Sequence, residues 1–152
     1  MPWCGGSQMT SSIFIPDLFR LISKYLKNLE RCNIEKRELW LWDTLYVVGN
    51  YLTDGTRCLE APDLAKALKA TAHPDCVEKR ETKVTGPYLE YVADRDYALL
   101  AGIGPDGVYL VENIGGAVSC VCKSDIGPAE FLKAIDILEK WYWKLRSYLD
   151  LE

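Results

Sequence analysis

Aromatic rings mixed with cationic side chains are the feature of this sequence best suited to chemistry with a ligand. One such group lies close together in the first third of the chain and consists of Arg37, Trp40, Trp42 and Tyr46. Flat rings allow bases to stack and cations hold phosphates, which is the combination that binding of single-stranded nucleic acid requires. Stacking is tolerant of base identity, so this group predicts binding without sequence preference.

The segment that carries these rings also allows a purely structural interpretation. We expect it to form a helix from Ile34 to Leu52, with Asn33 as its N-cap. The positions whose helical spacing would face the core are Leu41, Leu45, Val48 and Leu52. Trp40 would then lie on nearly the opposite side. Because a helix that is apolar on two sides is commonly sandwiched inside a core, burial stays open as the alternative to ligand binding.

A second group of rings and cations lies in the middle of the chain and consists of Lys79, Arg80, Lys83, Tyr88, Tyr91 and Arg95. It would extend the same surface, with the lysines and arginines contacting phosphates. Nearby glutamates partly cancel the basic potential. The alternative is a solvated edge strand that its charges protect from pairing with another chain.

A tryptophan near the C-terminal end is the third candidate contact. Trp143 falls on the polar side of the last predicted helix, where a solvated ring makes little sense without a partner. Homodimerisation explains it as well as a ligand does. The alternative function is therefore a protein-interaction or dimerisation module with no nucleic-acid role, in which Trp40, Tyr51 and Trp143 would be buried against another chain.

Catalysis finds little support in the motifs. The sequence has no nucleophile elbow, P-loop, zincin helix or dinucleotide fingerprint, so we expect neither an enzyme nor a cofactor. His73 stands where a helix should end and is interpreted as a capping residue. The six cysteines include no CxxC pair, and with one histidine no metal site is expected. Cys58 and Cys76 flank a predicted helix and are the pair most suited to a disulfide.

Helices and an antiparallel sheet are expected to position these residues. Apolar periodicity predicts helices from Pro16 to Arg31, over 34–52, from Pro62 to just before Pro74, and from Pro128 to the C-terminus. Short β-favouring runs lie at 77–85, 88–93, 97–103, 108–113 and 117–122. Their links are too short for crossover helices, which predicts an antiparallel meander of four or five strands.

The expected fold class is therefore α+β. It comprises three N-terminal helices, the four- to five-stranded meander, and a long C-terminal helix packed on one face of the sheet. Residues 1–13 are expected to form a flexible arm, and residues 14–152 a single domain.

Composition and charge limit the classes of function. With 152 residues, 49% of them hydrophobic and 26% charged, the chain has the balance of a globular domain. No apolar stretch is long enough to span a bilayer, and the N-terminus lacks the pattern of a secretory signal, so we expect a cytoplasmic protein without a membrane partner. A net charge of −4 argues against a broad basic surface for duplex DNA. The scarcity of methionine and histidine is typical of hyperthermophiles.

With this order of elements, and with Trp40, Trp42 and Tyr46 near Arg37, Arg80 and Lys83, the chain resembles ThermoDBP, the single-stranded DNA-binding protein family of thermoproteal and related archaea. The resemblance covers most of residues 14–150. It implies a cleft between helices and sheet, lined by aromatic groups and flanked by basic ones. Some members carry a leucine zipper after the last helix, and none follows Leu149 here. The expected function is sequence-independent binding of single-stranded DNA, or of RNA.

Overall fold

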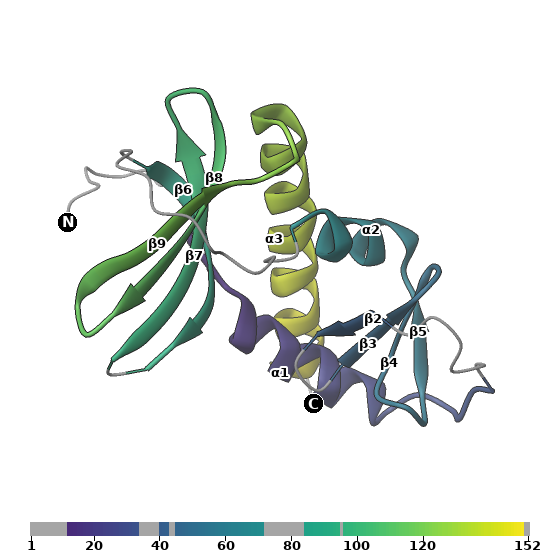
Figure 1. Cartoon of the computed structure of the whole chain (residues 1–152). Coiled ribbons are helices and arrows are strands. Elements are labelled where there is room, and N and C mark those ends of the chain that lie inside the picture. Colours follow the sequence, from purple (N-terminus) through teal and green to yellow (C-terminus); the bar gives the residue numbers. More distant parts are fainter. Residues whose placement is uncertain (1–11, 34–39, 43–44, 72–83, 95, 151–152) are drawn as a thin grey trace.

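The computed structural model describes residues 12–33, 40–42, 45–71, 84–94 and 96–150, except for the side chains of residues 12, 40–42, 85–87, 92–93 and 120. Over those ranges the chain forms three helices and nine strands arranged in two sheets (Figure 1). The expected class, α+β, is confirmed. The expected arrangement of elements is wrong in two respects, the number of sheets and the order of the helices.

The larger sheet has five strands in the order β1-β6-β7-β8-β9. Their bounds are Ser12–Phe14, Thr85–Ala93, Tyr97–Gly104, Gly107–Ile114 and Ala117–Lys123. From β6 to β9 the strands form the expected antiparallel meander, and β1 pairs with β6 in parallel. Ser12 and Ile13, which the sequence assigned to a flexible arm, thus belong to the sheet. Most of the strand expected at 77–85 lies outside the described residues.

The smaller sheet replaces the helix that was predicted over 34–52. Its strands follow the order β2-β3-β4-β5, with the bounds Trp40–Trp42, Leu45–Val48, Tyr51–Thr53 and Cys58–Glu60. Leu45, Val47 and Leu52 are buried, as alternation along paired strands requires. The apolar residues on both sides of the supposed helix are therefore explained by a period of two.

A two-residue hairpin turn explains why this segment forms strands with a period of two and not a helix with a period of 3.6 residues. Val48 pairs with Tyr51, so Gly49 and Asn50 make the whole connection between β3 and β4. Gly49 has a φ of 58°, a left-handed conformation that glycine adopts without steric cost and that tight hairpins favour. A helix continuing through this turn would require a different backbone conformation at Gly49.

The described helices are α1 at Ile15–Leu26, α2 at Pro62–Ala70 and α3 at Pro128–Asp150. Each begins at or beside a proline, whose missing N–H costs nothing in the first turn of a helix. The expectation of three successive N-terminal helices is wrong, because in the described residues only α1 precedes the small sheet and α2 follows it. The long final helix is confirmed, and Figure 1 shows it standing between the two sheets.

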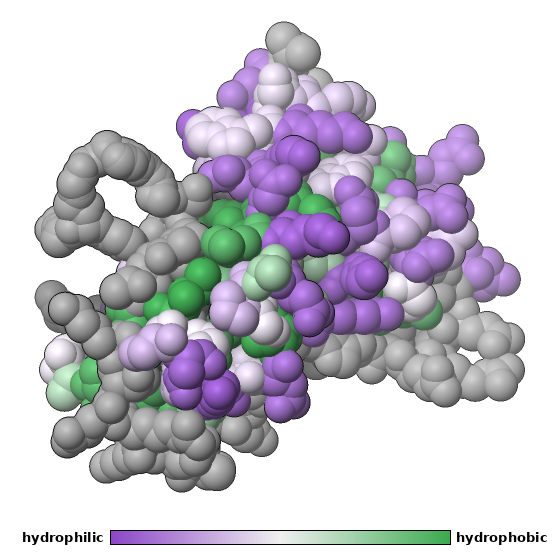
Figure 2. All heavy atoms as spheres, turned by 90° about the horizontal axis from the view of Figure 1, so that it is seen from above, coloured by the Kyte–Doolittle hydropathy of each residue, from purple (hydrophilic) through white to green (hydrophobic). Residues whose placement is uncertain are grey.

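One hydrophobic core joins these layers. It combines Ile22 of α1, Leu68 of α2 and Leu138 of α3 with Leu110 of the large sheet and Leu45 of the small one. Seen from above, the described surface is mostly hydrophilic, and a band of apolar side chains reaches it near the middle of the molecule (Figure 2). None of the helices in the described ranges combines the length and apolar character that crossing a bilayer requires.

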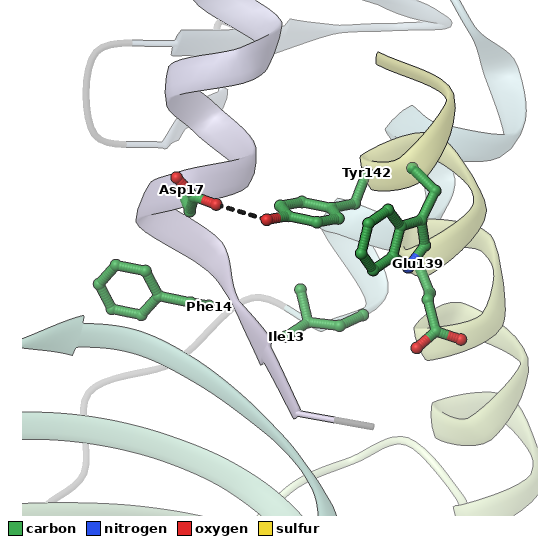
Figure 3. A pocket seen from close by; sticks show the side chains of 6 residues that line it. Ile13, Phe14, Asp17, Glu139 and Tyr142 are labelled. Carbon is green, nitrogen blue, oxygen red and sulfur yellow. Dashed lines mark hydrogen bonds between the residues drawn. The ribbon is translucent and has the colours of Figure 1, made fainter. Parts of the chain in front are cut away.

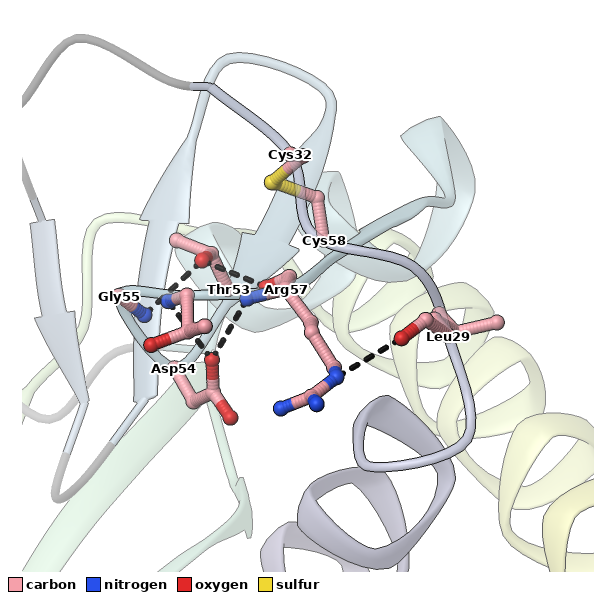
Figure 4. Close-up of a disulfide and its surroundings, with 8 residues drawn as sticks. Leu29, Cys32, Thr53, Asp54, Gly55, Arg57 and Cys58 are labelled. Carbon is pink, nitrogen blue, oxygen red and sulfur yellow. Dashed lines mark hydrogen bonds between the residues drawn. A yellow bond between two sulfur atoms is a disulfide. The ribbon is translucent and has the colours of Figure 1, made fainter.

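A disulfide fixes the small sheet to the end of α1. Cys58 of β5 is bonded to Cys32 and not to the expected Cys76, which lies outside the described residues (Figure 4). The backbone brings Cys32 to this position, since its N–H donates to the carbonyl of Thr56 at 3.1 Å. In addition, Nε of Arg57 donates to the carbonyl of Leu29 at 2.8 Å. Spacing around α2 could not reveal this partner, because the contact arises from the β4–β5 hairpin.

That hairpin is closed by side-chain hydrogen bonds. The carboxylate of Asp54 accepts the backbone N–H groups of Thr56 and Arg57, each at 2.9 Å. Desolvation of Asp54 acts in the opposite direction, yet these bonds keep the pKa of its carboxyl below the ordinary value. The hairpin therefore presents Cys58 in a defined position.

Gly102 in β7 is a place where a small change should cost stability. A Cβ there would lie 2.6 Å from Cγ1 of Val84 and 2.7 Å from Cδ1 of Tyr88. The Tyr88 ring is held by its hydroxyl, which donates to the carbonyl of Val84 at 2.5 Å. We expect Gly102→Ala to lower the free energy of unfolding by about 1–3 kcal/mol in urea denaturation, since overpacking outweighs the gain in chain entropy.

A double-mutant cycle provides the control for that prediction. Val84→Ala removes the atom closest to the new methyl group, so the cost of Gly102→Ala should shrink in the Val84→Ala background. Equal costs in the two backgrounds would show that the clash is not with Val84.

Candidate functional site

A pocket of about 220 Å³ lies where β1 runs into α1, opposite the second half of α3 (Figure 3). Ile13, Phe14 and Asp17 line it from the first segment, and Glu139, Tyr142 and Trp143 from the second. The two segments are far apart in sequence, and α1 and α3 pack directly against each other. The pocket therefore exists only in the folded chain.

Local structure explains which side chains reach the pocket. β1 passes into α1 without a loop, and Phe14 is the N-cap position of the helix. Phe14 is consequently left 40% exposed at this junction, while Ile13 beside it is buried. On α3, residues three and four positions apart lie on the same side of the helix, which brings Tyr142 and Trp143 next to Glu139.

A chain of hydrogen bonds ties the two walls together. The hydroxyl of Tyr142 donates to Oδ2 of Asp17 at 2.8 Å and accepts Nη1 of Arg146 at 3.0 Å. The other carboxylate oxygen of Asp17 accepts Nη2 of Arg20 at 2.6 Å and its Nε at 3.0 Å. The hydrogen bond from Arg20 keeps the pKa of Asp17 below its ordinary value, with desolvation opposing and Tyr142 assisting.

Trp143 is the most exposed aromatic residue at the pocket. Its side chain is 57% exposed, and its ring meets that of Tyr142 edge to face with centroids 5.2 Å apart. Cζ of Arg146 lies 5.6 Å from the centroid of the Trp143 ring, within the range of a cation–π contact. An exposed ring that is braced by two neighbours is already oriented for a ligand or partner.

The lining of the pocket is aromatic, apolar and acidic, with two carboxylates and no cation. The carboxylate of Asp17 is bonded to Arg20 and Tyr142. In the ranges that the structure describes, no group of three His, Cys, Asp or Glu residues could hold a metal ion.

Of the residues that the sequence proposed for nucleic-acid contact, the structure describes the side chains of Tyr46, Tyr88 and Tyr91, and none of these three lines the pocket. Tyr46 and Tyr88 are half-buried on different sheets. The side chains of Trp40 and Trp42 are not described; in the backbone register they pair with the buried residues Val47 and Leu45. The proposed cations, Arg37, Lys79, Arg80, Lys83 and Arg95, all lie outside the described residues.

Tyr91 does not fit the role in stacking that the sequence suggested. Its side chain is only 4% exposed, and its hydroxyl donates to the carbonyl of Thr71. Burial raises the pKa of its phenol. No base could reach this ring without unfolding the core around it, so Tyr91 is a core residue.

Sequence reasoning found one wall of the pocket in part and missed the other. Trp143 was recognised from its place on the polar side of the last helix. The spacing of Glu139, Tyr142 and Trp143 was a usable signal, since it puts them on one side of a helix. No pattern in the sequence could indicate that Phe14 and Asp17 stand opposite them.

Nothing among the known protein families, the curated proteins or the solved structures matches this chain. The resemblance to ThermoDBP therefore stays a prediction, and the pocket has to be interpreted from its own geometry.

Proposed function

We propose that this protein is a binding protein, and not an enzyme, that recognises a segment of a partner protein at the pocket between α1 and α3. One observation carries the proposal: two exposed aromatic residues, Phe14 and Trp143, border a hollow whose walls are braced by hydrogen bonds. Aromatic anchors of this kind contribute most to protein interfaces, because they bury a large apolar area at a low cost in conformational entropy.

Other exposed apolar residues support the choice of this site by contrast. Tyr51, Ile114, Val118, Leu132 and Tyr148 are also exposed, but none of them lines the pocket. Exposed apolar residues are normal on protein surfaces. The pocket, in contrast, is bordered by two exposed aromatic rings, those of Phe14 and Trp143.

Selection of peptides tests the proposal directly. A random peptide library displayed on phage would be panned on the immobilised protein, and the enriched peptides synthesised and titrated by calorimetry. We expect Trp143→Ala to weaken their binding by about tenfold or more, as loss of a tryptophan anchor does. The matched control is Leu132→Ala, which removes an exposed apolar side chain of the same helix and should leave affinity unchanged. Failure to enrich any peptide, or equal affinity for Trp143→Ala, would refute the proposal.

Binding of single-stranded DNA is the second candidate, and one observation favours it. Arg146 stands over the exposed Trp143 ring, so a ring and a cation are adjacent as stacking on nucleic acid requires. This reading predicts that oligo-dT quenches tryptophan fluorescence, and that affinity falls as salt rises. The two carboxylates that line the pocket oppose phosphate, which is why we place this function second.

Light scattering distinguishes self-association from binding of a different protein. A dimer that dissociates in Trp143→Ala would make a second copy of this chain the partner.

An archaeal origin, life at high temperature and a cytoplasmic location remain predictions from the sequence.

A further inference from the structure

The charge of the pocket indicates what kind of group it accepts. Its lining contains two carboxylates, Asp17 and Glu139, and no cation. Arg20 balances the charge of Asp17 through a 2.6 Å ion pair. Among the residues that the structure describes, no hydrogen bond or ion pair engages Glu139. Arg146 adds a second positive charge near the carboxylate of Asp17, but it does not line the pocket. Within the lining, Glu139 is the carboxylate that no described residue engages, which favours a cationic ligand over an anionic one.

The aromatic walls favour the same sign of charge. Phe14, Tyr142 and Trp143 line the pocket, and the faces of such rings attract cations. The guanidinium of Arg146 beside the Trp143 ring shows this preference within the protein itself. Arg146 is also bonded to the hydroxyl of Tyr142 and is not among the lining residues of the pocket.

The shortage of hydrogen-bond acceptors narrows the class of cation further. The Tyr142 hydroxyl already donates to Asp17 and accepts from Arg146, and both oxygens of Asp17 are engaged. Among the side chains that line the pocket, the carboxylate of Glu139 is the acceptor that no described residue engages. An unmodified ammonium carries three N–H donors and would lose hydration here without full replacement, whereas a methylated ammonium keeps its charge and has few or no donors to satisfy.

We propose that the pocket binds the trimethylammonium group of a methylated lysine in the partner segment. This inference rests on the proposed function, because it assumes that the occupant belongs to another protein. The rings of Phe14, Tyr142 and Trp143 surround the methyl groups, and Glu139 supplies the opposing charge. Recognition of quaternary ammonium groups by aromatic side chains uses the same physical attraction.

Small probes test the inference without knowledge of the partner. The blocked amino acid N-acetyl-trimethyllysine methylamide would be titrated into the protein while the indole N–H signal of Trp143 is followed by NMR, its assignment given by Trp143→Phe. We expect saturable shifts of that signal. The unmodified lysine amide, and the neutral carbon isostere of the trimethylammonium side chain, should each bind about tenfold more weakly.

Two variants separate charge from shape. Glu139→Gln keeps the size of the side chain and should weaken binding of the trimethyllysine amide several-fold, while Glu130→Gln in the first turn of the same helix should not. Equal binding of the neutral isostere, or an unchanged affinity of Glu139→Gln, would overturn the inference. The absence of any shift of the Trp143 signal would overturn it as well.

The outcomes also distinguish this inference from the proposed function. If selected peptides bind through Trp143 but none requires a methylated lysine, the proposed function as a binding protein is supported and the inference of a trimethyllysine site is refuted. If choline binds more tightly than the trimethyllysine amide and no peptide is enriched, the pocket belongs to a free quaternary ammonium ligand, and both proposals fall in favour of that one.

Discussion

Replacement of Leu138 by alanine is expected to lower the free energy of unfolding by about 2–5 kcal/mol. Leu138 lies midway along α3 and is fully buried. The helix that carries it contacts α1, α2 and strands of the large sheet. Truncation would remove apolar contacts and leave a cavity where these elements meet, and the close-packed surroundings can relax only in part.

The same helix offers a matched control. Leu132 is the same residue type on the same helix, but its side chain is 45% exposed. Leu132→Ala should change the free energy of unfolding by about 0.5 kcal/mol or less. Urea unfolding followed by circular dichroism measures both variants, and comparable losses would show that α3 does not occupy the core as described.

The Leu138→Ala variant should also unfold in a single step. Because one hydrophobic core contains residues of both sheets and all three described helices, loss of packing at α3 affects the two sheets together. Hydrogen exchange of amides in β8 and β4 is the direct measurement. Equal apparent free energies of opening for the slowest amides of β8 and β4 in wild type, and equal decreases in the variant, agree with one cooperative unit. Destabilisation confined to β4 would contradict it.

Elements with long, regular periodicity were predictable from the sequence. The helix predicted from Pro128 onward is one of them: Phe131, Ile135 and Leu138 follow the four-three spacing of a helix face in the sequence, and all three are buried. The turns between β6, β7, β8 and β9 were equally visible, because turn-forming residues mark each of them: Asp94 and Asp96 in the first, Gly-Pro-Asp-Gly at 104–107 in the second, and Gly115-Gly116 in the third. Local signals of this kind are strong because they depend only on neighbouring residues.

The segment 40–53 was misread for a physical reason. Leu41, Leu45, Val48 and Leu52 fit a helical spacing, and the alternation of a strand was hidden by aromatic residues at the intervening positions. The decisive signal was the pair Gly49–Asn50, which is a hairpin turn in the structure. A glycine at this position disfavours a helix, because glycine in a helix interior costs about 1 kcal/mol relative to alanine.

Long-range contacts could not be predicted in the same way. The bond from Tyr142 to Asp17 joins residues separated by 125 positions, and the parallel pairing of β1 with β6 joins Ser12 to Tyr88, half of the chain away. Both depend on how the helices pack on the sheet. For that reason the sequence located the exposed ring of Trp143 but not the pocket beside it.

Removal of the disulfide between Cys32 and Cys58 is the second large effect we expect. The bond closes a loop with a sequence separation of 26 residues, and the chain-entropy relation gives about 3.5 kcal/mol of stabilisation for a loop of that length at 25 °C. A Cys32→Ser/Cys58→Ser double variant should lose free energy of unfolding on that scale. Thermal and urea unfolding of the variant and of the oxidised wild type measure the difference.

The folded structure should survive this change. The amide of Cys32 is bonded to the carbonyl of Thr56, and Arg57 is bonded to the carbonyl of Leu29, so the contact between the end of α1 and the β4–β5 hairpin does not depend on the sulfur atoms. The loss arises mainly because the unfolded chain gains freedom. Amide chemical shifts away from the two cysteines should therefore stay close to those of the wild type.

A reducing agent supplies the internal control for the disulfide. Phosphine reduction should bring the wild type to the stability of the double variant and should leave the double variant itself unchanged, because both then lack the same loop closure. Mapping by mass spectrometry of the oxidised protein should recover a peptide that links Cys32 to Cys58. A peptide linking Cys58 to Cys76, or a double variant as stable as the oxidised wild type, would contradict the assignment. If the assignment holds, the disulfide acts mainly on the unfolded ensemble, whereas the core around Leu138 acts on the packing of the native state. The two contributions to the free energy of unfolding should therefore add.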